Sequence, residues 1–229
     1  MSQHFVDFAS AVVSENGEDQ KHCLLQPTNF SCRTLEYVIR NSHGNIMIQY
    51  RRGAKTRRHH YCSKYSGKLL KDMKGGRNIV IDGKHSEDAK SSISKVDCEF
   101  NFQFKQARTD AEVVKITWKY LNMTSTSLKA TKGWFQFVFT DCFIAKSSVQ
   151  QGYTHGIALT SLFIHILHCT WINGGEIGFS NAKFADLRIM NSSLSKLRIL
   201  VNSTYVRVYF FNVFYESSNV NETAILISP

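Results

Sequence analysis

The sequence predicts an all-β protein that folds as a parallel β-helix, a solenoid whose coils stack on one another. The chain of 229 residues is 43% hydrophobic and 12% aromatic, which suits one large β-rich domain. Apolar residues alternate with polar ones at a period of two, the pattern of strands with one buried face. The alternating segments also recur at spacings of 21, 27, 23 and 21 residues, and a repeat of this length indicates a solenoid.

The repeat runs from Val114 onward in five rows. Reading down the rows, the predicted interior columns are Val114, Phe135, Leu162, Ala185, Val206; Ile116, Phe137, Ile164, Leu187, Val208; Trp118, Phe139, Ile166, Ile189, Phe210; Leu121, Cys142, Cys169, Ser192, Val213; and Met123, Ile144, Trp171, Leu194, Tyr215. No row can bury its own apolar face, so the rows must stack about 4.8 Å apart as parallel strands. A β-sandwich would show the same alternation, but it would not explain the coil-length repeat, and hairpin signals are sparse.

Shorter apolar pieces follow the rows and predict a second sheet. They are Ile157 with Leu159, Ile177 with Phe179, Leu197 with Ile199, and Ile225 with Ile227. Asn and Gly between the pieces tolerate left-handed turns. The extra residues of the 27-residue coil, 146–155, are predicted to form an outward loop.

The N-terminal half is predicted to lead into the solenoid. Leu35, Val38 and Ile39 would share one face of a short amphipathic helix, able to cap the first coil. We expect residues 1–44 to form this leading and capping segment and residues 45–229 the β-helix. The first strands are placed at 45–48 and 78–83, with a basic insertion at 51–77 between them.

These features resemble a known family. A Cys followed by Thr-Leu-x-x-Val-Ile, then a short strand, an Ile-x-Ile-x-Gly segment and coils with Cys at the strand end is similar to the pectin-lyase-like superfamily, in the extracellular form of animal proteins. The residues that carry the resemblance are Cys32, Thr34, Leu35, Val38, Ile39, Ile79, Ile81, Gly83, Cys142 and Cys169. The resemblance covers most of the chain and implies a right-handed β-helix, but it is weak for function.

Many such proteins are polysaccharide lyases or hydrolases. An inverting hydrolase needs two carboxyl groups flanking the scissile bond. The segments nearest to polygalacturonase motifs begin at Asn122, Thr140, His155 and Arg188, and three of the motifs lack a charged group. Asp141 alone cannot act as both general acid and general base. A lyase would need calcium-binding carboxylates, and the five rows contain no outward acidic ladder. We therefore predict no catalytic residues.

Metal and cofactor sites are not predicted either. The six cysteines include no CxxC pair with zinc spacing. His165 and His168 fall on opposite faces of an extended strand, with His165 outward and His168 at the strand-end turn. Cys142 and Cys169 share a column, so we expect stacked inward thiols, while a disulfide between adjacent coils is geometrically allowed. The pairing of Cys62 and Cys98 is left open.

The sequence features that indicate the cellular compartment of the protein conflict with one another. The N-terminus has no apolar stretch long enough for a secretory signal. Cys23 and Cys32, nine positions apart among turn-forming residues, suit a local disulfide and an oxidising compartment. Five N-x-S/T sequons also favour secretion, at Asn29, Asn122, Asn191, Asn202 and Asn221. We expect an extracellular or cell-surface protein. An incomplete N-terminal sequence would explain why no secretory signal is seen beside the sequons and the cysteine pair. The uncharged stretch 156–175 contains two His and is interpreted as buried strands, not as a membrane span.

The net charge of +10 is concentrated in one segment. Residues 51–77 contain ten Lys and Arg and a single acid, Asp72, so nine of the ten net charges lie there. Several guanidinium groups on one loop can bind sulfate, phosphate or carboxylate groups. The predicted polyanion site comprises Arg51, Arg52, Lys55, Arg57 and Arg58. A plain solvated loop has the same composition.

The leading functional hypothesis is a noncatalytic extracellular β-helix module for adhesion or for binding glycans or proteins, with a sulfated or acidic glycan or an extracellular protein as partner. The alternatives are a carbohydrate-active enzyme, either a polysaccharide lyase or a hydrolase, and a basic nucleic-acid-binding protein. Paired carboxylates would favour the enzyme, and unoccupied sequons would favour the nucleic-acid-binding protein.

Overall fold

The structure is a computed structural model that describes residues 9–14, 16–27, 29–50, 69–73, 76–83, 94–96, 99–104, 113–151, 160–180, 182–203, 205–216 and 225–228. Its strands are β1 (Ala9–Val13), β2 (Ile46–Tyr50), β3 (Leu69–Met73), β4 (Asn78–Asp82), β5 (Ser94–Val96), β6 (Glu99–Phe104), β7 (Val114–Lys119), β8 (Leu121–Thr124), β9 (Ser127–Thr140), β10 (Phe143–Gln151), β11 (Thr160–Leu167), β12 (Thr170–Ser180), β13 (Phe184–Ser195), β14 (Leu197–Asn202), β15 (Val206–Glu216) and β16 (Ile225–Ser228). The helices are α1 (His22–Leu25) and α2 (Leu35–Asn41).

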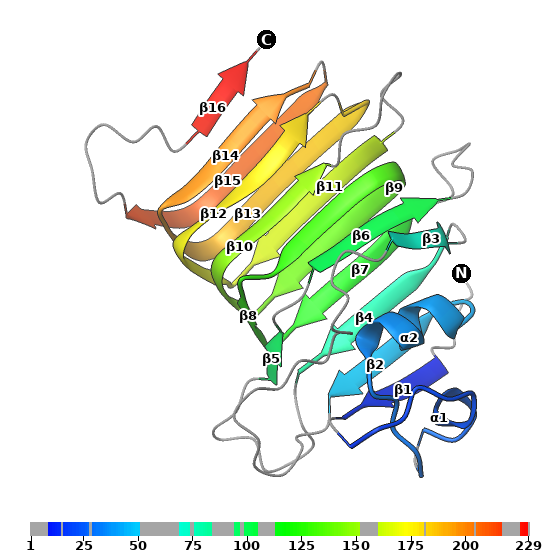
Figure 1. Cartoon of the computed structure of the whole chain (residues 1–229). Helices are drawn as coiled ribbons and strands as arrows, with labels where there is room; N and C mark the ends of the chain where they lie inside the picture. Colours follow the sequence, from blue (N-terminus) through cyan, green and yellow to red (C-terminus); the bar gives the residue numbers. More distant parts are fainter. Residues whose placement is uncertain are drawn as a thin grey trace, which may run out of the picture.

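Every strand pairing among these elements is parallel, and the strands stack as a β-solenoid (Figure 1). The predicted fold class is therefore confirmed. The pairings define three faces. Face A contains β1, β2, β4, β7, the second half of β9, β11, and the first halves of β13 and β15. Face B contains β5, β8, the starts of β10 and β12, and the ends of β13 and β15. Face C contains β3, β6, the start of β9, the ends of β10 and β12, β14 and β16.

The chain bends between face A and face B at a left-handed residue in every coil from β7 onward. These corner residues are Tyr120, Asp141, His168, Asn191 and Asn212, with φ between 48° and 53°. A second series turns the chain from face B to face C and comprises Ser125, Lys146, Asn173 and Lys196. A single left-handed residue changes the strand direction and returns the next side chain to the interior.

The predicted interior columns are confirmed from β7 to β13; the residues of β15 pair as predicted, but Phe210 and Tyr215 in the last row are exposed. Phe135 pairs with both Val114 and Leu162, Leu162 pairs with Ala185, and Ala185 pairs with Val206. The column residues preceding β15 are buried and belong to one continuous hydrophobic core, apart from the polar Ser192. Ser192 is tolerated because its hydroxyl donates to the Met190 carbonyl and accepts from the Cys169 amide.

The predicted loop at 146–155 is wrong in its first half. Strand β10 continues to Gln151, and Val149 is buried between Leu128 and Ile177 on face C. The loop was predicted from the extra length of this coil, but Lys146 is a left-handed corner residue after which β10 continues. Residues 152–159, including Ile157 and Leu159, lie outside the described residues. The other three predicted apolar pieces pair on face C as Ile177 with Ile199 and Ile199 with Ile225.

The N-terminal segment both caps the solenoid and contributes a strand to it. Within 1–44, β1 pairs with β2 on face A, an arrangement that sequence reasoning missed. The predicted helix is α2, and its Leu35, Val38 and Ile39 are buried in the core. Within the basic insertion, β3 pairs with β6. In the described residues, neither helix is long and apolar enough to cross a membrane.

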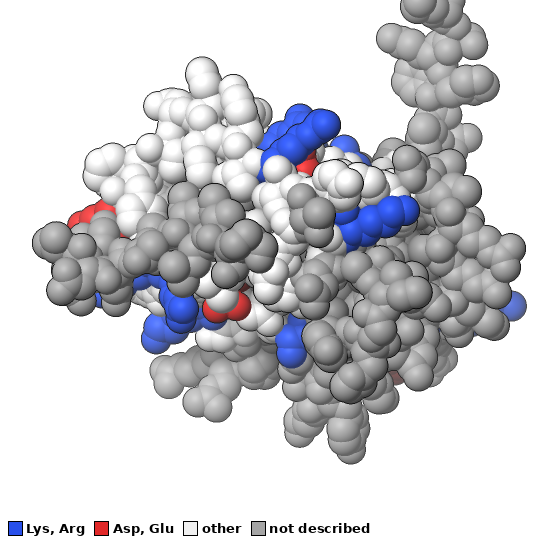
Figure 2. All heavy atoms as spheres, turned by 90° about the horizontal axis from the view of Figure 1, so that it is seen from above, with Lys and Arg blue, Asp and Glu red and all other residues white. Residues whose placement is uncertain are grey.

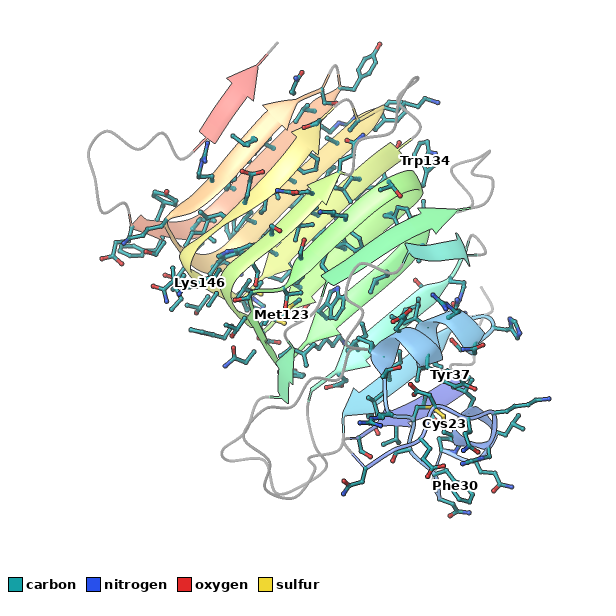
Figure 3. The ribbon with its side chains drawn as sticks, viewed as in Figure 1. Cys23, Phe30, Tyr37, Met123, Trp134 and Lys146 are labelled. Atoms are coloured by element: carbon teal, nitrogen blue, oxygen red, sulfur yellow. A yellow bond between two sulfur atoms is a disulfide. The ribbon has the colours of Figure 1, made fainter. Side chains whose placement is uncertain are left out.

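Two local links hold the cap together. The predicted disulfide between Cys23 and Cys32 is present, with 5.1 Å between the Cα atoms (Figure 3). Thr34 caps α2, because its hydroxyl accepts from the Tyr37 amide at 3.2 Å. The same hydroxyl donates to Asp19 at 2.6 Å, and Asp19 also accepts from the amides of Arg33 and Thr34. The carboxylate thus joins the disulfide-bonded segment to the helix.

Candidate functional site

An aromatic ladder lies on the outer surface of face A, where the strands begin. It consists of Trp134 on β9, Phe163 on β11, Phe184 on β13, and Tyr205 just before β15. The Trp134 and Phe163 rings stack with 6.0 Å between centroids. The Trp134–Phe184 and Phe184–Tyr205 centroid distances are each 5.6 Å. Four rings from successive coils therefore form one continuous strip, and Trp134 marks it in Figure 3.

The solenoid register explains why these rings meet. Trp134, Phe184 and Tyr205 each precede the first interior residue of a row, so they occupy equivalent outward positions. The intervening coil has the small, buried Ser161 at this position. Phe163, two residues further along β11, stacks on the ring of Trp134, which also contacts Phe184 directly. Reading the column one position before each interior row would have revealed this site.

A pocket of about 440 Å³ opens along the ladder. All four rings line it, together with Asp186 and Arg207 and the short side chains of Ala185 and Val206. The Lys183 ammonium lies 6.0 Å from the centroid of Trp134 and 5.6 Å from that of Phe184. The pocket therefore combines apolar ring faces with both donors and an acceptor.

A polar row borders the pocket on the same face. The Asp186 carboxylate accepts from Arg188 at 2.8 and 3.2 Å and lies 3.4 Å from His165 Nε2. On its other side, His165 Nδ1 lies 3.3 Å from the Gln136 amide nitrogen. Burial, followed by the positive charge of Arg188, lowers the pKa of His165, with opposing contributions from Asp186. The row is thus a preorganised set of hydrogen-bonding groups around a neutral imidazole.

The pocket offers a ligand both aromatic ring faces and fixed hydrogen-bonding groups. Aromatic side chains provide rigid, amphipathic contact area, and a few fixed polar groups orient a ligand in a pocket. Across the described outer surface of face A from β7 to β15, Asp186 is the only carboxylate. This carboxylate is paired with the Arg188 guanidinium.

The residues nearest to hydrolase motifs are not brought together. Asn122 lies on face B, Asp141 at the corner between faces A and B, and Arg188 on face A. His155 lies outside the described residues. Asp141 belongs instead to a polar corner ladder with His168, Asn191 and Asn212. Its Oδ1 atom is 3.8 Å from His168 Nδ1, His168 Nε2 is 3.2 Å from Asn191 Nδ2, and Asn212 donates to Asn191 at 3.0 Å.

The sequons occupy several environments. Asn29, Asn191 and Asn202 are exposed, and Asn191 is part of the corner ladder. Asn122 is half-buried, and its side-chain oxygen accepts from Thr124 at 3.0 Å. Asn221 lies outside the described residues.

Cys142 and Cys169 are buried free thiols, as expected from their shared column. The hydrogen bond with Cys169, together with burial, raises the pKa of the Cys142 thiol. The structure also describes no group of three or more His, Cys, Asp or Glu side chains that could hold a metal ion.

All five residues of the predicted polyanion site, Arg51, Arg52, Lys55, Arg57 and Arg58, lie outside the described residues, as do Cys62 and Cys98. Comparison of the chain with protein-family models, with curated proteins and with solved structures found no match.

Proposed function

We propose that this protein is a noncatalytic, extracellular glycan-binding β-helix module related to the pectin-lyase-like superfamily. The observation that carries the proposal is the aromatic ladder of Trp134, Phe163, Phe184 and Tyr205 beside a polar row. Sugar rings present apolar C–H faces and hydroxyl rims, so stacked aromatic rings flanked by hydrogen-bonding groups complement both. A ladder spanning several coils suits an oligosaccharide better than a single sugar.

The cationic groups around the ladder favour an acidic or sulfated glycan. Lys183 and Arg207 flank the pocket, and Asp186 is already paired with Arg188. The basic segment at 51–77 would add a second, salt-sensitive contribution through Arg51, Arg52, Lys55, Arg57 and Arg58. The Cys23–Cys32 disulfide is compatible with an extracellular location.

The test is a glycan array probed with the full chain secreted from a eukaryotic host, followed by calorimetry with the best acidic oligosaccharide. Trp134→Ala and Phe184→Ala should each weaken binding about tenfold, because truncating a central aromatic anchor commonly costs more than about 1 kcal/mol. Phe30→Ala is the matched control, since Phe30 is an exposed aromatic on the N-terminal segment. Unchanged affinity in both ladder variants would reject this site.

A second measurement separates the contribution of the ladder from that of the basic segment. Replacing the five residues Arg51, Arg52, Lys55, Arg57 and Arg58 by Gln should lower the salt needed to elute the protein from heparin, through reduced counterion release. It should leave binding of a neutral oligosaccharide unchanged. Chain-shortened glycan products after long incubation would instead favour the enzyme alternative.

A further inference from the structure

The Ser161 hydroxyl is buried at the centre of the aromatic ladder. The register partners of Ser161 are Trp134 on β9 and Phe184 on β13. Ser161 is 0% exposed, and no described group forms a hydrogen bond with its Oγ atom. A hydroxyl can both donate and accept, and most buried polar side-chain atoms in folded proteins have a hydrogen-bond partner. This hydroxyl is therefore an exception, and its burial costs stability unless a ligand pairs with it.

The contact between the Trp134 and Phe184 rings separates this hydroxyl from the pocket. The two residues belong to the strands on either side of β11, so two strand spacings, about 9.6 Å, separate their Cα atoms. Their ring centroids are only 5.6 Å apart. The two side chains therefore lean toward each other across Ser161. Both rings line the pocket, but Ser161 is not among the described residues that line it.

The same spacing leaves room for one sugar ring when the two side chains stand upright. Rings about 9.6 Å apart hold a third ring about 4.8 Å from each, within the range of ring-to-ring contacts in proteins. Phe163, which stacks on Trp134, bounds this slot further along β11. Opening the slot loses the contact between Trp134 and Phe184 but gives the hydroxyl a partner. An unpartnered buried hydroxyl costs at least as much as such a ring pair contributes.

Charge alone does not define which sugar the ladder binds. Seen from above, basic side chains are dispersed over a largely uncharged described surface (Figure 2). Lys183 and Arg207 provide positive charge at the pocket for any acidic sugar. A hydroxyl at a fixed position distinguishes one sugar from another, because a ring without a matching polar group would leave it unpaired.

We propose that Ser161 determines the specificity of the aromatic ladder. A sugar ring enters between Trp134 and Phe184, and a hydroxyl on its leading edge forms a hydrogen bond with Ser161. This inference rests on the proposed glycan-binding function and deepens it, since it assigns the glycan a binding mode and one required group. Glycans whose inserted ring lacks a hydroxyl at that edge are refused.

The experiment measures affinity and stability in the same variant. The probes are a hyaluronan-derived and a heparin-derived tetrasaccharide, one carboxylated and one also sulfated. Ser161→Ala should weaken binding of whichever probe the wild type binds roughly five- to tenfold by calorimetry, through loss of one hydrogen bond. The same substitution should raise the urea midpoint of the unliganded protein, because it removes a buried hydroxyl without a partner. A merely structural role would not give these opposite changes.

Two further variants complete the design. Ser180→Ala, at an exposed serine of face C, is the matched control and should change neither quantity. In Phe184→Ala the hydroxyl reaches water, so adding Ser161→Ala should no longer raise the urea midpoint. A rise of the same size in both backgrounds would overturn the inference, because the rings would then not be what buries the hydroxyl.

The remaining outcomes separate this inference from the proposed function. Unchanged affinity in Ser161→Ala, while Trp134→Ala weakens binding, would overturn the role of Ser161 and leave the proposed function intact. A lower urea midpoint in Ser161→Ala would also overturn it, because the hydroxyl would then have a partner in the unliganded protein. A wild type that binds neither tetrasaccharide would reject both this inference and the acidic-glycan proposal.

Discussion

Arg77 shows how burial changes the role of a charged residue. By sequence it belongs to the basic segment, but in the structure it is 6% exposed. Its guanidinium donates to the carbonyls of Gly44 and Ile39 at 2.8 and 3.2 Å and to the Ser42 hydroxyl at 2.9 Å. Burial lowers the pKa of Arg77 from its ordinary value. The side chain therefore ties the C-terminal end of α2 to the first coils, where a positive charge also complements the helix dipole.

Replacement of Arg77 by Leu is expected to destabilise the fold by about 2–4 kcal/mol, because three buried acceptors lose a charged donor. The free energy of unfolding in urea measures this loss. Arg40→Leu is the control, since Arg40 is exposed and pairs with Glu36 on the surface of α2. It should cost less than about 1 kcal/mol. Equal losses in the two variants would contradict the structural role of Arg77.

His165 predicts a pH dependence of stability. Its pKa is lowered in the folded state, so the unfolded chain binds the proton more readily. Stability from this group is complete above the unfolded-state pKa of about 6.5 and is lost as the pH falls from there toward the folded-state pKa. Urea midpoints at pH 7.5 and 5.5 should differ less in His165→Gln than in wild type. His43→Gln, at an exposed histidine, should keep the wild-type difference, and an unchanged difference in His165→Gln would refute the prediction.

At the scale of elements, each strand is stabilised by the coils above and below it. Ile164 lies between Phe137 and Leu187, and all three side chains are fully buried. Adjacent coils at strand spacing leave no room for water between such side chains. The same stacking explains why β15, with a neighbour on one side, is the most exposed described strand of face A from β7 onward.

Ile164→Asp should lower the free energy of unfolding by upward of about 3 kcal/mol, because the carboxylate has no polar partner among its column neighbours. Thr170→Asp, at an exposed position of β12, tests for a general effect of added charge and should be near neutral. Thermal unfolding followed by circular dichroism is the measurement. Cooperative unfolding at wild-type stability in Ile164→Asp would mean that the register is wrong.

At the scale of the whole molecule, three features lie on separate parts of the solenoid surface. Face A carries the aromatic ladder, the corner between faces A and B carries the polar ladder with Asn191, and the far end carries the edge of β15. Asn29 and Asn202 are also exposed, and neither lines the pocket of the aromatic ladder. Glycans at these asparagines are therefore compatible with ligand binding at the ladder.

If the protein is secreted, protein from its native source should carry N-linked glycan on at least one of Asn29, Asn191 and Asn202. Glycosidase treatment should reduce its mass, and peptide mapping should show an Asp at each formerly occupied site. Asn122 should be the least occupied of the described sequons, because it is half-buried and bonded to Thr124. An unchanged mass would argue against secretion.

The interior of this protein follows from its sequence pattern. Period-two alternation at a coil-length repeat identified the five columns, because each interior position must be apolar in every coil. The helix over Leu35, Val38 and Ile39 and the pairing of Cys23 with Cys32 were likewise predicted from local patterns. Each of these features depends on residues close in sequence or on one strictly repeated position.

The contacts on the outer surface depend on the three-dimensional fold, because outward residues are not constrained to repeat. Phe163 joins the aromatic ladder by stacking on Trp134, although the residue that pairs with Trp134 on β11 is Ser161, two positions earlier. Arg77 is buried through contacts with residues 33 to 38 positions away. β1 joins the stack through its parallel pairing with the edge of β2. These contacts join residues that the stacked coils bring together from distant parts of the sequence, so a local sequence pattern does not predict them.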